Sequence, residues 1–244
     1  MENIREHVYL AALLHDIGKF YQRADTGSVK DSQYLTSGVR NLKEDLQANI
    51  DAATSYEDIL WTVQFIIDNE SILNNLVGFN AADLSLESNP FSYLSSLGKL
   101  IKEANSLASD NDYKDDKTDS GAFKTKRLSS IFESIRLNTK QLSEQPQKYQ
   151  TPVHEISLSD QSFPRNNFES SPDYESLWSA FTREFKAIPV TDCRSFSETL
   201  LSLLFKYAWC IPTSTANLSD VSMYDHAKMT AALAICLYDH EHDS

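Results

Sequence analysis

The residues best suited to chemistry are a histidine and an aspartate in direct succession, His15 and Asp16, near the start of the chain. They stand at the end of an apolar run and are followed closely by Gly18 and Lys19. An imidazole and a carboxylate are both good ligands for divalent transition metals such as Mn²⁺, Fe²⁺, Ni²⁺ and Zn²⁺. The pair therefore predicts a metal site, provided that the fold brings further ligands to it.

The local backbone decides whether these two residues can act together. Adjacent residues on a helix point about 100° apart, so His15 and Asp16 can share an ion only near a helix end or across a two-metal centre. Gly18 relaxes the backbone at about this place, and Lys19 would then lie where it could contact a substrate phosphate. The alternative interpretation is a helix C-terminus with Gly18 at its cap and Lys19 on the surface.

A further candidate ligand, His226, lies near the other end of the chain. Ser222 is followed three residues later by Asp225, a spacing typical of a helix start with a capping box. The N-terminal end of a helix disfavours imidazolium and so favours the neutral ring that a metal ligand requires. A single histidine at such a position is more often an ordinary surface residue, so its significance comes from its combination with His15 and Asp16.

The composition favours a helical protein. The chain has 244 residues, 41% of them hydrophobic, and only six glycines. With few alternating apolar and polar runs, these numbers argue against a sandwich, a barrel or a Rossmann domain. We predict an all-α bundle in one domain, 1–244, whose first helix includes Val8 to Tyr21 and is largely buried. Further helices are predicted at 40–51, 56–68, 91–108, 126–137, 173–187, 195–208 and 221–238.

Two stretches break the helical pattern. Residues 109–121 contain five aspartates and almost no apolar residues, which predicts an acidic flexible loop. The spacing of a calcium-binding EF-hand is absent there. Residues 143–172 carry four prolines and a short alternating segment at 153–158, and they predict an extended connector that could include one small β-hairpin.

The net charge of −13 and the isoelectric point near 4.8 argue against strong nucleic-acid binding by the chain alone. The densest group of basic residues is Lys124, Lys126 and Arg127, beside the acidic loop. A metal ion or a partner subunit would therefore have to supply positive charge.

The chain has three cysteines without CxxC spacing, which argues against a disulfide framework or a zinc ribbon and favours the cytoplasm. Cys210 has no basic neighbour in the sequence and is expected to be a buried small hydrophobe. The apolar runs are too short to span a bilayer, and acidic residues near the start argue against a signal peptide, so no membrane partner is expected.

Several other residues that could do chemistry receive structural interpretations. His240 and His242 are expected to lie in a frayed, solvated C-terminal end rather than in a metal site. Trp61, Trp178 and Trp209 are each part of a helical apolar pattern, which favours core packing over base stacking.

Four segments together resemble one known family. They read LLHDIGKF-Q-A at 13–24, SSIF-SI at 129–135, YAWCIP-ST at 207–215 and DVSMYDHAKMTAALA at 220–234. The chain resembles the N-terminal HD domain of the large signature subunit of type III-A CRISPR effector complexes, without the palm domain that makes cyclic oligoadenylate. On that resemblance the chain is an excised domain or one half of a split subunit.

The resemblance implies a circularly permuted HD fold, with the His-Asp doublet in the first helix and the usual first histidine in the last. It also implies a metal-dependent, single-strand-specific DNA nuclease that works inside an RNA-guided ribonucleoprotein with other subunits. His15 and Asp16 then match the doublet and His226 matches the histidine of the last helix. Asp16 and Lys19 are the catalytic candidates.

The chain departs from the family pattern between its ends. No histidine occurs between His15 and His154, and the stretch 61–70 offers Asp68 and Glu70 where the family has a His-His pair. Two placements of the family's ligand aspartate remain open. The preferred one puts Asn105 there, because the acidic loop follows it, and the other puts Asp83 there. Asn is a poor ligand for a transition metal because it brings no negative charge.

These departures predict a weakened or inactive nuclease. A single Mn²⁺ or Ni²⁺ held by three ligands is favoured over two ions, and the complete loss of metal stays open. The main alternative is a degenerate HD domain that serves as a non-catalytic assembly module of the complex. A stand-alone HD nucleotide phosphohydrolase is disfavoured, because such enzymes usually begin with their first histidine and carry the doublet later.

Overall fold

The structure is a computed structural model that describes residues 2–25, 30, 32–37, 39, 57–76, 96–109, 122–134, 149–159, 162–214 and 219–242. Within these ranges the secondary structure is helical, with isolated β-bridges and no sheet, which confirms the predicted all-α class. The predicted helix at 40–51, the acidic loop from 110 onward and Asp83 lie outside the described residues.

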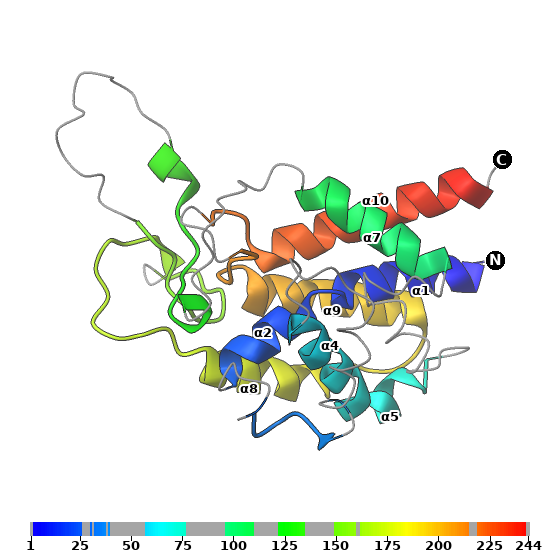
Figure 1. Cartoon of the computed structure of the whole chain (residues 1–244), viewed down its shortest axis with the longest axis horizontal. Helices are drawn as coiled ribbons and strands as arrows, with labels where there is room; N and C mark the ends of the chain where they lie inside the picture. Colours follow the sequence, from blue (N-terminus) through cyan, green and yellow to red (C-terminus); the bar gives the residue numbers. More distant parts are fainter. Residues whose placement is uncertain are drawn as a thin grey trace.

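The first and last helices of the chain lie side by side (Figure 1). Helix α1 (Glu2–Leu14) packs along α10 (Met223–His242), and α7 (Ser96–Ser109) and α9 (Cys193–Ala208) each contact both of them. On the surface the Arg5 guanidinium donates to both carboxylate oxygens of Asp239, at 2.8 and 3.0 Å.

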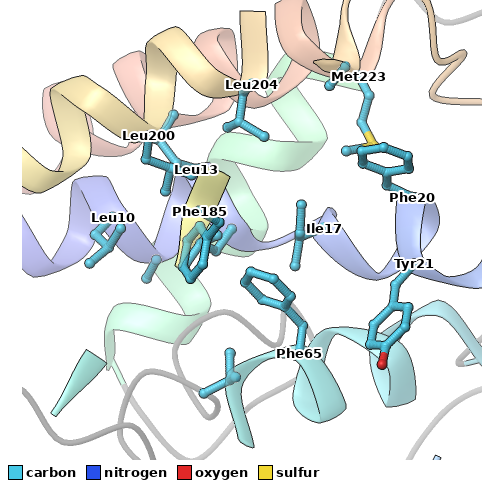
Figure 2. Packing of buried hydrophobic residues seen from close by; sticks show 14 of the residues in the cluster. Leu10, Leu13, Ile17, Phe20, Tyr21, Phe65, Phe185, Leu200, Leu204 and Met223 are labelled. Carbon is cyan, nitrogen blue, oxygen red and sulfur yellow. The ribbon is translucent and has the colours of Figure 1, made fainter. Parts of the chain in front are cut away.

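A second group of helices continues the bundle beyond α1. Helix α2 (Ile17–Ala24) packs against α4 (Glu57–Asp68) and α8 (Tyr174–Phe185), and the short α5 (Glu70–Leu73) follows α4. Figure 2 shows Ile17, Phe65 and Phe185 meeting in the core between these helices. The two groups are joined by the connection from α1 to α2 and by contacts between α8 and α9, and the residues between α1 and α2 are buried.

The predicted core tryptophans are placed largely as expected. Trp61 is fully buried, and Trp178 packs edge-on against Phe20 with ring centroids 4.9 Å apart. Trp209 is half-buried, and its indole N–H donates to the carbonyl oxygen of His154 at 3.0 Å. Polar anchoring of this kind is common for an indole at the edge of a core.

The prediction of a helix at 126–137 is wrong. The described part of this segment contains a bridge at Ser129 and a single 3₁₀ turn, Ile131–Ser134. A shorter turn, Ala122–Lys124, precedes it. The Ser129 N–H donates to the carbonyl of Ser219 and the Ser130 N–H to that of Tyr149, so these donors are used by distant segments instead of a helix.

In the described part of the predicted connector 143–172, residues 153–158 form no strand, but one antiparallel bridge is present. This antiparallel pairing flanks residues 153–158 and lies within the connector. Gln150 and Arg165 exchange two backbone hydrogen bonds of 2.9 Å each, and Gln150 also forms a bridge with Ser129. Three extended segments therefore meet at Gln150 without forming a sheet.

The C-terminal end is helical rather than frayed, which corrects the expectation for His240 and His242. Helix α10 continues through His242, whose ring stacks on Tyr238 with centroids 4.1 Å apart. The Nδ1–H of His242 donates to the carbonyl oxygen of Tyr238 at 2.8 Å. Neither histidine belongs to a metal-binding group among the described residues.

Two further predictions from the sequence concern the thiol of Cys210 and the length of the apolar helices. Cys210 is fully buried, and this burial raises its thiol pKa to about 12, so it behaves as a small hydrophobe. None of the helices in the described ranges has both the length and the apolarity needed to cross a bilayer.

Gly18 allows helix α2 to approach α4 very closely. A Cβ atom at this position would lie 2.0 Å from the carbonyl oxygen of Asp58 and 2.5 Å from the backbone nitrogen of Thr62. The N–H of Gly18 instead donates to the Thr62 hydroxyl at 3.0 Å. Gly18 lies in the first turn of α2, so the alternative interpretation as a helix C-cap is wrong.

Replacing Gly18 with alanine is therefore expected to destabilise the protein by about 1–3 kcal/mol, because the added methyl group meets backbone atoms that cannot rotate away. Urea unfolding followed by circular dichroism measures this loss. Gln22→Ala, on the same helix but half-exposed, is the control and should change the free energy of unfolding by less than about 0.5 kcal/mol. Equal stability of the two variants would contradict the close contact.

Candidate metal centre

His15 and Asp16 lie in a break between two helices. Helix α1 ends at Leu14 and α2 begins at Ile17, so the predicted continuous first helix is in fact two. Asp16 has φ −106° and ψ 6°, and its side chain accepts no capping hydrogen bond from the backbone N–H groups of α2. Because the helix is interrupted here, the side chains of His15 and Asp16 need not point about 100° apart as they would on a regular helix. The Asp16 carboxylate is also not used as a helix cap.

His226 reaches this break from the first turn of α10. The Ser222 hydroxyl accepts from the backbone N–H of Asp225 at 3.0 Å and donates to the Asp225 carboxylate at 2.6 Å. The backbone N–H of His226 donates to the carbonyl oxygen of Ser222 at 3.0 Å. The helix start predicted from this spacing is therefore confirmed, and it fixes the position of His226.

The structure brings these three side chains together from the two ends of the chain. One carboxylate oxygen of Asp16, Oδ2, lies 3.5 Å from Nε2 of His15 and 3.5 Å from Nε2 of His226. The two imidazole rings have centroids 5.4 Å apart. One ligand atom from each residue lies within 4.8 Å of the others, and all three residues are less than 7% exposed.

The chemistry of this donor set fits a divalent transition ion. The Nδ1–H of His15 donates to the carbonyl oxygen of Ala12 at 2.7 Å, which leaves the lone pair on Nε2. That Nε2 atom is buried and has no hydrogen-bond partner. A buried polar atom without a partner is costly, and a metal ion would satisfy it. Two imidazoles and one carboxylate are ligands that Mn²⁺, Ni²⁺ and Zn²⁺ all accept.

Lys19 is paired with Asp16 at the edge of the site. Its ammonium lies 2.6 Å from the same oxygen, Oδ2, and its side chain is 27% exposed. Burial favours a higher pKa for Asp16, but His15 and Lys19 more than offset it, and the pKa of the carboxyl lies well below its usual range. Asp16 is therefore an anion at neutral pH, as a metal ligand must be.

His226 is held in its neutral form. Burial lowers the pKa of the imidazole to about 4, although Asp16 opposes this shift. In the unfolded chain the ring has an ordinary pKa near 6.5. Between these two values the unfolded chain binds more protons than the folded protein, so stability falls as the pH falls.

This difference predicts a specific dependence of stability on pH. In the presence of a chelator, the free energy of unfolding is expected to fall by about 2 kcal/mol between pH 7 and pH 5 because of His226 alone. Urea denaturation of the protein and of His226→Leu at several pH values measures this contribution as the difference between two slopes. Parallel pH profiles for the two proteins would show that His226 is not buried as a neutral ring.

Asn105 lies at this centre. Its side-chain oxygen on α7 is 2.9 Å from Nε2 of His226, the same atom that faces Asp16. The preferred family placement, which put Asn105 at the position of a ligand aspartate, agrees with this location. As an uncharged amide it contacts a candidate ligand without adding an anion to the site.

Asp68 is not brought to the centre. Its carboxylate accepts hydrogen bonds from the Tyr21 hydroxyl at 3.0 Å and from the Gln64 amide at 2.7 Å. Among the described residues, the group able to hold a metal comprises His15, Asp16 and His226 without it. The sequence-based prediction of Asp68 as a ligand therefore lacks structural support.

Arg23 was not singled out from the sequence, although it connects α2 to the segment that leads into α10. This buried guanidinium donates to the carbonyl oxygen of Lys19 at 2.9 Å and to that of Pro212 at 2.8 Å. Pro212 forms a β-bridge with Ser222, the residue that caps α10 ahead of His226. The sequence does contain a signal for this contact, because residues four apart, such as Lys19 and Arg23, lie on one face of a helix.

Asp58 on α4 was also overlooked. One of its carboxylate oxygens is buried without a hydrogen-bond partner. Burial raises the pKa of Asp58, with Lys19 opposing the shift and Asp16 adding to it. Asp58 therefore belongs to the electrostatic surroundings of the centre, and no spacing rule in the sequence connects it to the doublet.

The chain is similar in sequence to a CRISPR protein over nearly its whole length. No protein-family model matches the chain. The chain is 30% identical over 262 aligned positions to the "CRISPR system single-strand-specific deoxyribonuclease Cas10/Csm1 (subtype III-A)" of Methanocaldococcus jannaschii, in an alignment covering 98% of this chain. The chain is homologous to the Cas10/Csm1 large subunit of subtype III-A. It spans 29% of the length of that Cas10/Csm1 protein.

Solved structures of Csm1 have the same fold. A Csm1–Csm4 subcomplex of the type III-A CRISPR-Csm interference complex matches with a TM-score of 0.55 at 22% identity, covering 98% of this chain and 28% of the matched one. Csm1 from T. onnurineus matches with a TM-score of 0.53 at 26% identity, covering 96% of this chain and 28% of the other. The chain therefore corresponds to little more than a quarter of the length of each Csm1 relative.

Proposed function

We propose that the chain is the HD nuclease domain of a type III CRISPR large subunit, cutting single-stranded DNA with a divalent metal at His15, Asp16 and His226. The observation that carries this proposal is the meeting of three buried ligand atoms within 4.8 Å of one another. The name of the M. jannaschii relative, a single-strand-specific deoxyribonuclease, supports the substrate class.

In this proposal His15 and His226 hold a Mn²⁺- or Ni²⁺-type ion through neutral imidazoles, and Asp16 contributes the negative charge. The bound ion would lower the pKa of a water molecule and polarise the phosphodiester. Lys19 lies at the edge of the site, where its ammonium can contact a non-bridging phosphate oxygen and stabilise the charge that develops there. Burial lowers the pKa of His226 to about 4, so this imidazole is unprotonated at neutral pH, as a metal ligand must be.

We propose further that the activity is weak. Asn105 contacts His226 but brings no charge, and Asp68 is committed to Tyr21 and Gln64. Two-metal cleavage needs enough anionic ligands to hold both ions. The described residues offer one anionic ligand in the cluster, which favours a single ion.

The alternative function is a non-catalytic assembly module of the complex. It is favoured by the 2.6 Å ion pair between Lys19 and Asp16, which neutralises the carboxylate without any metal. In both cases we propose that the chain works in the cytoplasm inside an RNA-guided ribonucleoprotein, beside partners such as the Csm4 subunit that accompanies Csm1 in the matched complexes.

Incubation of the purified chain with end-labelled single-stranded DNA and Mn²⁺ tests the two functions. Slow cleavage that requires Mn²⁺, and is lost in the double variant His15→Ala, Asp16→Ala, is expected for the nuclease. Elemental analysis after purification without chelators should then find about one ion per chain. No cleavage and no bound metal would support the assembly module instead.

A further inference from the structure

A cavity of about 410 Å³ lies apart from the metal centre, beside the extended segments that meet at Gln150. Arg127 and Arg165 are part of its wall, together with His154 and Phe168. Arg127 belongs to the densest basic group of the sequence, and Arg165 is brought to it from a distant segment. Two cations thus share one cavity in a chain with a net charge of −13.

The two guanidinium groups are organised around one aromatic ring. The guanidinium carbon of Arg127 lies 3.8 Å from the centroid of Phe168, and that of Arg165 lies 5.5 Å from it. Arg127 is 7% exposed and donates to the carbonyl oxygen of Ser170 at 2.9 Å, so its orientation is fixed. Arg165 is exposed at the rim. Fixed guanidinium donors suit the planar, two-point recognition of a phosphate group.

Two acidic residues, Glu169 and Asp173, also line the wall. Glu169 is exposed, and Asp173 is used as the N-cap of α8, accepting from the backbone N–H of Ser176 at 3.0 Å. A capping carboxylate is partly neutralised by the helix N-terminus that it serves. The guanidinium groups in the wall of the cavity are those of Arg127 and Arg165.

A chain of contacts joins this cavity to the metal centre. Tyr174 donates its hydroxyl to the carbonyl oxygen of Lys126, next to Arg127. Its ring lies 5.9 Å from the guanidinium of Arg23, which in turn donates to the carbonyl of Lys19. The cavity and the centre are thus connected through Tyr174 and Arg23, by contacts that include the backbone carbonyls of Lys126 and Lys19.

From this juxtaposition we propose that the cavity binds a backbone phosphate of single-stranded DNA, between Arg127 and Arg165, and so holds the strand that leads to the metal centre. This inference rests on the proposed function, and it adds a binding site for the DNA substrate that is separate from the metal-binding residues. The ligand chemistry is a phosphodiester, and a free nucleotide is the competing source of the same group.

Fluorescence anisotropy with a labelled single-stranded oligothymidylate, in EDTA so that no cleavage occurs, tests the site in the full chain. Arg165→Glu is expected to weaken binding about tenfold and to reduce the slope of log K against log salt by about 0.7, the contribution of one phosphate contact. Arg165→Lys keeps the charge but loses the planar pair of donors, so it should bind more weakly than the unmodified protein and more tightly than Arg165→Glu. Because Arg165 is exposed, both variants are expected to fold.

Arg183→Glu is the matched control, since this exposed residue lies on α8 about 15 Å along the helix from Asp173 and makes the same change of charge. Equal weakening by Arg165→Glu and Arg183→Glu, or no weakening by Arg165→Glu, would overturn the site. Thymidine monophosphate that competes as strongly as the oligonucleotide would assign the cavity to a free nucleotide and also overturn it. Mn²⁺ binding, measured separately by calorimetry, reports on the proposed function and should not change in Arg165→Glu.

Discussion

Asp16→Asn is expected to lower the affinity for Mn²⁺ by at least about 100-fold, because even partners outside the ligand set typically change metal affinity 10- to 100-fold. Asp16 is the one carboxylate in the cluster formed by the described residues, and both imidazoles face its Oδ2 atom. An amide of the same shape removes the negative charge while it preserves the packing. Isothermal titration calorimetry with Mn²⁺ on the chelator-treated protein measures the change.

Asp68→Asn serves as the matched control for this experiment. It makes the same chemical change in a carboxylate that binds Tyr21 and Gln64 instead of facing the cluster. Its Mn²⁺ affinity should stay within about threefold of the unmodified protein, whatever small loss of stability follows from the broken hydrogen bonds. If Asp68→Asn lost metal binding and Asp16→Asn kept it, the ligand set would be a different one.

Asn105→Asp is expected to have the opposite effect and to raise the Mn²⁺ affinity by about 10- to 100-fold. The Asn105 oxygen already lies 2.9 Å from Nε2 of His226, so the substitution adds a second carboxylate without moving the backbone. In the metal-free protein this new anion lies near Asp16, and the repulsion should lower the melting temperature. Added Mn²⁺ should then raise the melting temperature more than it does in the unmodified protein.

Ser106→Asp provides the corresponding control, because it adds the same charge to the exposed neighbouring position of α7. That variant should leave both the Mn²⁺ affinity and the metal-dependent rise in melting temperature unchanged within error. A similar gain in both variants would mean that the added charge acts at long range, and Asn105 would then not be positioned at the centre. Cleavage of single-stranded DNA by Asn105→Asp indicates whether the missing ligand limits the reaction.

The helices that could be predicted from the sequence are those with a strong apolar period and clear ends. Helix α8 is an example, since Asp173 caps it and its apolar residues form one buried face. The segment after Arg127 has a similar period but is not a helix, because Ser129 and Ser130 donate to Ser219 and Tyr149. A local sequence pattern does not reveal such competition between local and distant hydrogen-bond partners.

The candidate centre was predictable where a motif and a helix end coincide. The His15-Asp16 doublet and the capped start of α10 both have local signatures, so both could be recognised from their spacing. Their meeting could not be derived from spacing, because it depends on the packing of α1 against α10. Arg23 and Asp58 were not recognised for the same reason, since Pro212, which accepts from Arg23, and Lys19, which lies near Asp58, belong to other segments of the chain.

The position of the candidate ligands at opposite ends of the sequence has a consequence for biosynthesis. A growing polypeptide contains His15 and Asp16 about 210 residues before it contains the third candidate ligand, His226. Contacts between such distant positions also form late, because closing a long loop costs entropy that few other contacts offset at that stage. The ion would therefore be captured only after nearly the whole domain has been synthesised, and incomplete chains would carry none.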